Sequence, residues 1–543
     1  MTLDQARAIA CNDRLIVVTA GAGAGKTAVL TGRVERLLRD GIWPTRILVV
    51  TFTRAAATEL RERLAERLDK RALGGLRVQT IHAWCLGMLR DNPAPAGLRE
   101  NFSIYDAVDV EDIQRQILAD LCIKQKTWKG ATSSAHPDQA WGLAEEYKRR
   151  LKSWNATDFD GLLSGAELVL RDRPEVTPGG LHILVDEAQD TAPIPWRLFE
   201  LLKPASLFVV GDPRQAIYGF QGARIEEMQA LQARATTIVL RENFRSRPHI
   251  VVAANAISRQ MTPAQPDMAA MRATSGVVVE LSAASVAHAV QRLLYDDDGA
   301  GDAPAPSDVA ILGRTWAALE PVADALRALG IKAELATPAR DPWASAGARV
   351  VLQGLRAICN DSDGHSARGL LSEITDSDRV AALRAVALRS GLSLLAVDEA
   401  LAIAVRSVRA DLADAFQAAS RLIESLGLVQ LYRYTGRTSK AADVVAALGL
   451  IGQWHSDGRG SSVRDLLDWL LQRDLQERAQ EASGDGVYLG TIHSAKGLEW
   501  PTVILLDWTP RGDEQEELRC RYVGMTRARD RLWLVRCDDA NKE

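Results

Sequence analysis

The chain carries, at residues 20–27, the stretch Ala20-Gly21-Ala22-Gly23-Ala24-Gly25-Lys26-Thr27. An apolar run precedes this stretch, and a helical pattern follows it to residue 38. A strand, a glycine loop and a helix in this order predict a phosphate-binding loop. Glycines let several backbone N–H groups point at one anion, and the helix N-terminus adds partial positive charge. Lys26 would then reach the β- and γ-phosphates, and the Thr27 hydroxyl would bind Mg²⁺.

The first position of this loop departs from the strict motif, which has glycine where the chain has Ala20. A glycine-rich turn without a ligand is the alternative interpretation. Lys26 and Thr27 follow directly after the last glycine. That order disfavours a bare turn and keeps the phosphate-binding prediction.

Length and composition bound the class of protein. A chain of 543 residues predicts roughly three or four domains, and 47% hydrophobic with 25% charged residues is typical of soluble globular proteins. A net charge of −4 means that any DNA-binding groove must be locally basic. The six cysteines are scattered without a C-x-x-C pair, which disfavours zinc and iron–sulfur sites. No secretion signal and no apolar run of about 18 residues is found, so we expect a cytoplasmic protein without a membrane span.

Two adjacent carboxylates are the second strong indication of a nucleotide-binding site. The apolar run 181–185 predicts a buried strand, and Asp186 and Glu187 follow it directly. Ligands of open parallel sheets collect at the carboxyl ends of the strands. Beside a phosphate loop, Asp186 can hold Mg²⁺ through its water shell, and Glu187 can take the proton from an attacking water.

Other predicted strands also end in polar or aromatic residues. Phe52 stands at the end of the predicted strand 46–53 and is either a core aromatic or a platform on which a base stacks. His82 stands in the polar end of the short predicted strand 78–84 and, taken alone, is more often structural. Gln215 stands in the polar end of the predicted strand 207–215 and can sense a γ-phosphate, while Tyr218 and Phe220 can stack on bases.

Two long segments differ from these α/β regions. Residues 86–180 are helical by pattern and rich in Lys, Arg and Trp, and residues 341–486 are Ala- and Leu-rich and mostly helical. We interpret both as insertions. Within the first, the basic and aromatic stretch 147–154 either follows a phosphate backbone or forms a solvated helix face.

The motifs together resemble the UvrD/Rep/PcrA group of superfamily 1 helicases, over nearly the whole chain. The phosphate loop resembles that of the group, in which the first position is often Ala. Asp186-Glu187-Ala188-Gln189-Asp190 matches its DEAQD motif. The matching segments occur in the family order, at residues 21–27, 50–60, 183–190, 210–223, 240–246, 491–499 and 521–529.

The resemblance implies an α/β fold with two RecA-like parallel-sheet domains of the P-loop NTPase type, each with a mostly helical insertion. The implied domain 1A comprises residues 1–85 and 181–235, and its insertion 1B comprises residues 86–180. Domain 2A comprises residues 236–340 and 487–543, and insertion 2B comprises residues 341–486.

The resemblance also implies the roles of single residues. The catalytic residues would be Lys26, Asp186, Glu187, Gln215, Arg245 and Arg527, with the two arginines acting as arginine fingers. ATP would be bound by Gln5 and Phe244 at the adenine, by residues 20–27 at the phosphates and by Glu499 at the ribose. Thr27 and Asp186 would hold Mg²⁺. The single strand would lie near Phe52, His82, Tyr218, Phe220, Arg314 and His493.

The implied activity is ATP-driven 3′-to-5′ movement on single-stranded DNA, with single-stranded or tailed duplex DNA as the partner. Two residues depart from the family pattern, which usually has Arg at Gln221 and often Asn at Trp316. In size and architecture the chain is also similar to UvrD-like subunits that work beside a nuclease in phage-defence systems such as Gabija. The alternative function is therefore a DNA-sensing ATPase that assists a partner nuclease and unwinds little alone.

Overall fold

A computed structural model of the chain describes residues 1–123, 128, 137–219, 222–282, 286–295, 304–335, 342–375, 380, 383, 408–472, 485–508 and 513–536. The chain divides into two compact units. Unit 1 comprises residues 1–81, 174–339 and 474–543, and unit 2 comprises residues 82–173 and 340–473. The finer division into four domains stays a prediction.

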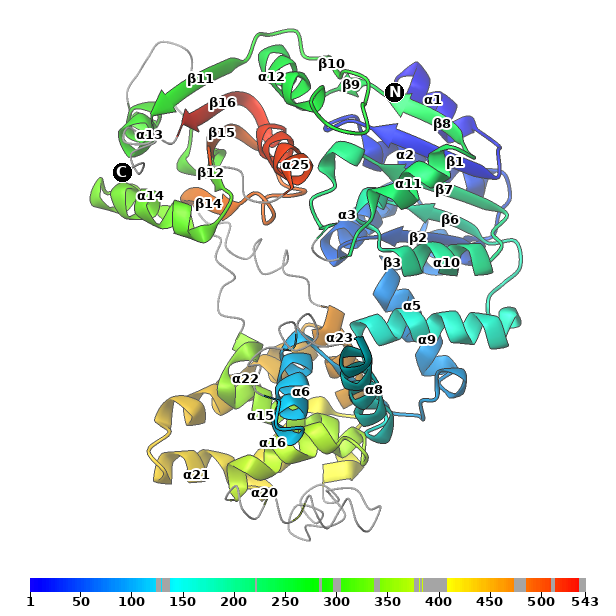
Figure 1. The fold of residues 1–543 in the computed structure, drawn as a ribbon, viewed down its shortest axis with the longest axis vertical. Coiled ribbons are helices and arrows are strands. Elements are labelled where there is room, and N and C mark those ends of the chain that lie inside the picture. The colour runs from blue at the N-terminus through cyan, green and yellow to red at the C-terminus, as the bar shows by residue number, and fades with distance from the viewer. Residues whose placement is uncertain are drawn as a thin grey trace. The chain divides into compact units, whose positions relative to one another are not determined.

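Unit 1 contains two six-stranded sheets whose neighbouring strands are all parallel (Figure 1). The first has the order β3-β2-β6-β7-β1-β8. Its strands are β1 (Leu15–Ala20), β2 (Ile47–Thr51), β3 (Arg77–Thr80), β6 (His182–Val185), β7 (Ser206–Gly211) and β8 (Thr236–Leu240). β2 and β7 are buried along their whole length and β1 from Ile16 onward, as expected for a parallel sheet with both faces covered.

The helices α2 (Lys26–Arg39) and α3 (Arg54–Ala65) bury their apolar sides against this first sheet. Leu30 of α2 and Leu60 of α3 share one core cluster with Ile16 of β1. The short helix α1 (Leu3–Ala10) lies on α2, where Gly32 leaves room for a side chain of α1: a Cβ at Gly32 would lie 2.6 Å from Cδ1 of Ile9. This packing places α1 and its Gln5 beside the phosphate loop.

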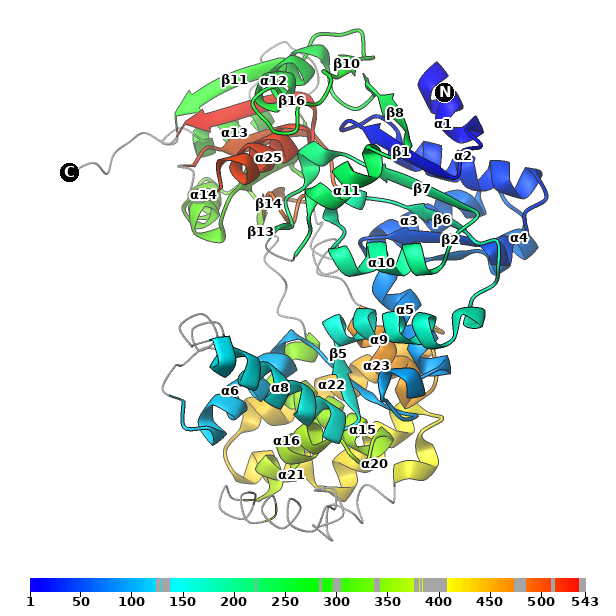
Figure 2. The ribbon, with the colours of Figure 1, turned by 45° about the vertical axis from the view of Figure 1, so that its right-hand side comes forward.

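The second sheet has the order β11-β16-β15-β12-β14-β13. Its strands are β11 (Val277–Ser282), β12 (Val309–Gly313), β13 (Ala333–Leu335), β14 (Val487–Thr491), β15 (Trp500–Leu506) and β16 (Ala528–Arg536). The helices α12 (Pro248–Ser258), α13 (Val286–Tyr295), α14 (Trp316–Ala328) and α25 (Glu514–Met525) accompany it. Two all-parallel sheets with helices confirm the predicted α/β class (Figures 1 and 2).

One predicted element is too long. The sequence predicts a helix over 516–529, whereas α25 ends at Met525. The hydroxyl of Thr526 donates to the carbonyls of Tyr522 and Val523, and β16 begins at Ala528, which pairs with Trp500 of β15. Parallel pairing therefore replaces the last predicted helical turn, and Arg527 lies in the tight connection between α25 and β16.

Unit 2 is mainly helical and has a buried ionic centre. Its longer helices are α6 (Ala107–Asp120), α8 (Pro137–Ser153), α9 (Phe159–Asp172), α15 (Ala346–Cys359), α16 (Gly364–Ile374), α20 (Ala415–Ser425), α22 (Thr438–Ser456) and α23 (Val463–Gln472). Asp109 of α6 is fully buried and pairs with Arg349 and Arg356 of α15. His365 of α16 lies 3.5 Å from the same carboxylate. This network joins the segments 82–173 and 340–473, which are far apart in the sequence.

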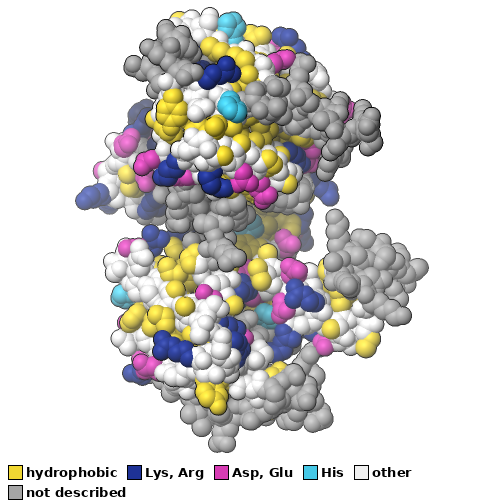
Figure 3. Space-filling view, turned by 90° about the vertical axis from the view of Figure 1, so that its left-hand side faces the viewer, with side chains coloured by type: hydrophobic (Ala, Val, Ile, Leu, Met, Phe, Trp, Pro, Cys, Tyr) yellow, Lys and Arg dark blue, Asp and Glu magenta, His cyan; other side chains and the backbone are white. Residues whose placement is uncertain are grey.

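The basic stretch of α8 is neutralised within unit 2. Lys148 lies 3.1 Å from Glu145, and Arg149 lies 2.7 Å from Glu146, both on the same helix. The face of the molecule in Figure 3 likewise shows basic and acidic side chains interspersed, without a continuous basic stripe among the residues described. The contacts of α8 favour the solvated-face interpretation over a track for phosphates.

Candidate active site

The phosphate-binding stretch connects β1 to α2 with a backbone that only glycine adopts readily. Gly23 and Gly25 have φ of 68° and 78°, in the left-handed region, and Lys26 begins the helix. The amide N–H groups of the first helical turn have no partner within the helix, so they can bind an anion. The chain therefore has the backbone geometry that a phosphate loop needs.

A carboxylate from the end of β6, which β7 separates from β1 in the first sheet, reaches this loop. Nζ of Lys26 lies 2.9 Å from Oε1 of Glu187, directly after β6. Glu187 has φ of 48°, which is unusual for a residue with a side chain and is held here by its surroundings. Burial alone would raise the pKa of Glu187, but the charges of Lys26 and Lys496 outweigh it and hold that pKa below its ordinary value. Glu187 is thus ionised and able to accept a proton once Lys26 leaves it.

Asp186 and Thr27 carry the oxygen atoms predicted to hold Mg²⁺. Burial, and then the negative charge of Glu187, raise the pKa of Asp186. No cluster of three or more His, Cys, Asp or Glu able to hold a metal exists within the described ranges. Mg²⁺ does not need such a cluster, because it commonly takes one or two protein oxygens and completes its shell with water and phosphate. The hydroxyl of Thr27 and the carboxylate of Asp186 fit that requirement.

Gln215 lies between the two sheets. It ends the short helical turn Pro213–Gln215 after β7, where Nε2 donates to Oδ2 of Asp212 at 2.8 Å. Its Oε1 accepts from Nη2 of Arg527 at 3.4 Å. A residue predicted to sense the γ-phosphate is therefore already in contact with one of the two predicted arginine fingers.

The two predicted arginine fingers lie near each other. Burial, and then the nearby charge of Arg245, lower the pKa of Arg527 to about 9. Arg245 forms an ion pair with Glu499, the residue predicted to contact the ribose, and donates to the carbonyl of Thr526 at 3.1 Å. Two cations held this close favour an anionic ligand between them.

The phosphate loop is bonded directly to the segment that carries Arg245. The amide of Phe244 donates to the carbonyl of Gly23 at 3.0 Å, and Nδ2 of Asn243 donates to the carbonyl of Ala22 at 2.7 Å. Sequence reasoning missed Asn243, although it lies in the matching segment 240–246. Its fully buried amide fixes the start of the Arg245 loop to the phosphate loop.

Gln5 is buried and both ends of its amide are used. Oε1 accepts from the amide of Thr2 at 2.9 Å, closing a capping box, and Nε2 donates to the carbonyl of Ala24 at 3.0 Å. One proton and one lone pair of the amide remain for an adenine edge. A cavity of about 450 Å³ lies beside Gln5 and is lined also by Val29 and Gly32. The ring of Phe244, at 44% exposure, is open for stacking.

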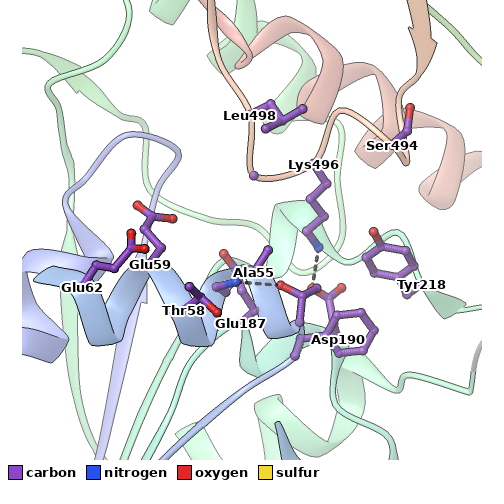
Figure 4. Close-up of a pocket in the computed structure, with 14 residues that line it drawn as sticks. Ala55, Thr58, Glu59, Glu62, Glu187, Asp190, Tyr218, Ser494, Lys496 and Leu498 are labelled. Atoms are coloured by element: carbon purple, nitrogen blue, oxygen red, sulfur yellow. Dashed lines mark hydrogen bonds and ion pairs between the residues drawn. The ribbon is translucent and has the colours of Figure 1, made fainter. Parts of the chain in front are cut away.

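The residues predicted to lie near DNA are only partly brought together. Phe52 and Tyr218 stack with ring centroids 5.0 Å apart, and His493 meets Tyr218 edge-on at 6.0 Å. Phe52 and Tyr218 line a cavity of about 360 Å³ (Figure 4). Arg314 is paired with Glu516 and Glu517 of α25.

Two further residues predicted to contact DNA, His82 and Phe220, are not among the described residues of unit 1. His82 belongs to unit 2, where it packs edge-on against Phe159 and burial lowers its pKa to about 4. These contacts are those of a structural histidine. Phe220 and the neighbouring Gln221 lie outside the described residues.

Lys496 is a site residue that sequence reasoning missed. It extends from the 491–499 segment of the second sheet to the carboxylate of Asp190 (Figure 4), and it donates to the carbonyl of Gln215 at 2.8 Å. Its ammonium group also lies 4.8 Å from the ring centroid of Tyr218. Lys496 stands in the quoted motif, but no local pattern indicates that its partner lies on the other sheet.

The comparisons with known proteins agree with this architecture. The model of the UvrD/REP helicase N-terminal domain matches residues 1–137 and 120–236, and the model of the UvrD-like helicase C-terminal domain matches residues 407–539. The two models together cover more than half of the chain, which therefore belongs to the UvrD-like family of superfamily 1 helicases.

Similar proteins include ATP-dependent DNA helicase UvrD1 of Mycobacterium tuberculosis, which is 29% identical over 629 aligned positions, 98% of this chain and 81% of the relative. ATP-dependent DNA helicase PcrA of Bacillus subtilis is 27% identical over 614 positions, 98% of this chain and 82% of the relative. Within the described part of the chain, no helix is long and apolar enough to span a membrane.

Proposed function

We propose that the chain is an ATP-dependent DNA helicase that moves 3′ to 5′ along single-stranded DNA. The observation that carries this proposal is the contact of Lys26 with Glu187 in a site to which the second sheet contributes Arg527. A phosphate loop, a carboxylate base and a cation from the opposite side are the parts that phosphoryl transfer to water requires. The names of the relatives, as ATP-dependent DNA helicases, support the same reaction.

The chemical step begins with the release of Glu187. Lys26 is drawn to the β- and γ-phosphates of bound ATP, so the Glu187 carboxylate becomes free to take a proton from the attacking water. Thr27 and Asp186 would hold Mg²⁺, which would supply positive charge at the phosphates. Arg245 and Arg527 stabilise the charge that develops on the transferred phosphoryl group.

Movement along DNA follows from contacts between the sheets. Lys496 joins Asp190, close to Glu187, to the ring of Tyr218. The ATP side and the aromatic side of the cleft are therefore linked through one side chain. Phe52 and Tyr218 would grip bases, each worth about 1–3 kcal/mol of stacking. Alternating closure and opening of the cleft would then move the strand in one direction.

Strand separation tests the proposal and its polarity. We would follow a fluorescent duplex carrying a 3′ tail, a 5′ tail or blunt ends, with ATP and Mg²⁺. The proposal predicts separation of the 3′-tailed duplex alone, and separation of the 5′-tailed duplex alone would contradict the polarity. DNA-stimulated ATP hydrolysis without separation of any duplex would favour the alternative, a DNA-sensing ATPase that assists a partner nuclease.

A further inference from the structure

We propose that Tyr522 is a positioning residue that connects the second sheet's side of the cleft to the phosphate loop and to Gln215. This inference rests on the proposed function. Tyr522 lies on α25, shortly before the predicted finger Arg527, and it is fully buried. A buried tyrosine hydroxyl usually finds polar partners, so the partners of this one indicate what it does.

The hydroxyl of Tyr522 lies at a junction of three segments. It is 3.4 Å from Oδ2 of Asp212, 3.5 Å from the amide nitrogen of Ala22 and 3.3 Å from Sδ of Met268. A hydroxyl has one proton to donate and two lone pairs that accept. It can therefore donate to the Asp212 carboxylate and accept from the phosphate-loop amide at the same time.

Arg214 holds this junction in place. Its Nε lies 2.9 Å from Oδ1 of Asp212, and its guanidinium carbon lies 5.3 Å from the centroid of the Tyr522 ring. Arg214 and Asp212 are both buried. The phosphate loop packs closely on the group, since a Cβ at Gly21 would lie 2.9 Å from Nη2 of Arg214. Burial, and then the charge of Asp212, raise the pKa of Tyr522, so its hydroxyl remains a proton donor.

The junction leads to the reacting groups through one carboxylate. Oδ2 of Asp212, which faces the Tyr522 hydroxyl, also accepts from Nε2 of Gln215 at 2.8 Å. Gln215 in turn accepts from Arg527 at 3.4 Å. Tyr522 and Arg527 belong to one helix and its following turn, so both ends of this chain of contacts move together with the second sheet.

The lengths of these contacts indicate how Tyr522 acts on the site. Contacts of 3.4–3.5 Å are at the outer limit of hydrogen bonding. Hydrogen bonds of catalytic sites are often long without ligand and shorten in the complex. Closure of the cleft would shorten the bond from Tyr522 to Asp212 and, through Asp212, fix Gln215 and Arg527 in their positions for hydrolysis.

A purely structural role is the competing explanation. The ring of Tyr522 packs in an apolar cluster with Ala22, Met268 and Leu518, and this packing needs no hydroxyl. Tyr522→Phe keeps the ring and removes only the hydroxyl. The matched control is Tyr488→Phe on β14, because the buried hydroxyl of Tyr488 lies 3.4 Å from Oγ of Ser494 and takes no part in the Asp212 junction.

The test is steady-state ATP hydrolysis at saturating single-stranded DNA by the full chain, with thermal melting of each variant. We expect Tyr522→Phe to lower kcat about tenfold, as for loss of a hydrogen bond to a charged group, while KM for ATP changes by less than about twofold. Tyr488→Phe should keep kcat within about twofold of the unchanged chain. In the Gln215→Ala background, Tyr522→Phe should lower kcat little further, because both residues act through the same series of contacts.

Three results would overturn the inference. The first is an unchanged kcat of Tyr522→Phe, and the second is a loss equal to that of Tyr488→Phe. The third is a double variant, Tyr522→Phe with Gln215→Ala, whose fold-loss in kcat equals the product of the losses of the two single variants. If the unchanged chain itself fails to hydrolyse ATP, the proposed function is contradicted and the inference falls with it, whereas the three results above leave the proposed function intact.

Discussion

Nζ of Lys26 lies 2.9 Å from Oε1 and 3.0 Å from Oε2 of Glu187, so the lysine of the phosphate loop is held by the residue predicted to be the general base. Gln189 also donates to Oε2 of Glu187, at 2.6 Å. A carboxylate occupied in this way is a poor base. Binding of a triphosphate would therefore have two effects at once, since it engages Lys26 and frees Glu187.

Glu187→Gln should abolish hydrolysis while leaving ATP binding intact, because glutamine keeps the shape of the side chain but cannot accept the proton. We expect kcat to fall by about 10²–10⁴, measured beside the affinity for a fluorescent ATP analogue. Glu59→Gln is the matched control, since Glu59 lines the same cavity as Glu187 but pairs with Arg63 on the surface of α3. An equal loss in the two variants would contradict the assignment of Glu187 as the base.

Gly23→Ala should impair the phosphate loop for two reasons. Gly23 has φ of 68°, and a Cβ there would lie 2.7 Å from Cβ of Arg245. The methyl group would both strain the loop and displace the arginine, so we expect ATP affinity to fall about tenfold or more. Gly74→Ala on α4 (Lys70–Gly75) is the control, because a Cβ at Gly74 meets nothing within 4 Å. Equal ATP affinities of the two variants would contradict the close contact.

Phe52→Ala should weaken binding of single-stranded DNA. Phe52 stacks on Tyr218 beside the cavity, and a lost stacking contact costs about 1–3 kcal/mol per base. The dissociation constant for a labelled oligonucleotide, measured by fluorescence anisotropy, should rise about 5- to 150-fold. Trp43→Ala removes an exposed aromatic side chain away from this cavity and should leave that constant unchanged. If Phe52→Ala binds the oligonucleotide as tightly as the unchanged chain, Phe52 is only a core aromatic.

Asp109→Asn should destabilise unit 2 in a pH-dependent way. Burial alone would raise the pKa of Asp109, but Arg356, the hydrogen bond from His365 and Arg349 outweigh it and hold the pKa well below its usual value. A depressed pKa in the folded state gives stability that is present above the unfolded pKa of about 3.9 and is lost as the pH falls below it.

We expect Asp109→Asn to lower the free energy of unfolding by about 3–5 kcal/mol at pH 7, because it removes the carboxylate charge that pairs with the buried Arg356, whereas Arg349 keeps its pair with Asp106. Denaturant unfolding should show this difference shrinking as the pH is lowered below about 4. Glu145→Gln, at an exposed pair with Lys148, is the control and should change stability by about 1 kcal/mol or less. A difference for Asp109→Asn that stays constant with pH would contradict the ionic role of Asp109.

The local parts of this fold are predictable from the sequence. The order of strand, glycine loop and helix at 15–39 and the strand that delivers Asp186 and Glu187 each depend on a few consecutive residues, and the structure has both. The strand predicted over 207–215 is observed as β7, but it ends at Gly211, and Gln215 lies in the helical turn that follows. Apolar runs and turn residues are local signals, and parallel strands bring their carboxyl ends to one edge.

Contacts between distant segments are not predictable in this way. Lys496 meets Asp190, and Tyr522 meets Asp212, across sheets whose positions no local pattern specifies. The same holds for Asp109, because an acidic residue in a helix is usually solvated and the sequence gives no sign that two arginines of α15 surround it. The roles of such residues can be recognised only in the folded structure, in which distant segments are in contact.

The most direct measurement is the rate of ATP hydrolysis with and without single-stranded DNA, for the unchanged chain and for Glu187→Gln under the same conditions. The account predicts hydrolysis that DNA stimulates strongly and that Glu187→Gln abolishes. Hydrolysis that DNA does not change would contradict the link between the ATP site and the strand. No hydrolysis in either condition would contradict the catalytic roles assigned to Lys26, Glu187 and Arg527.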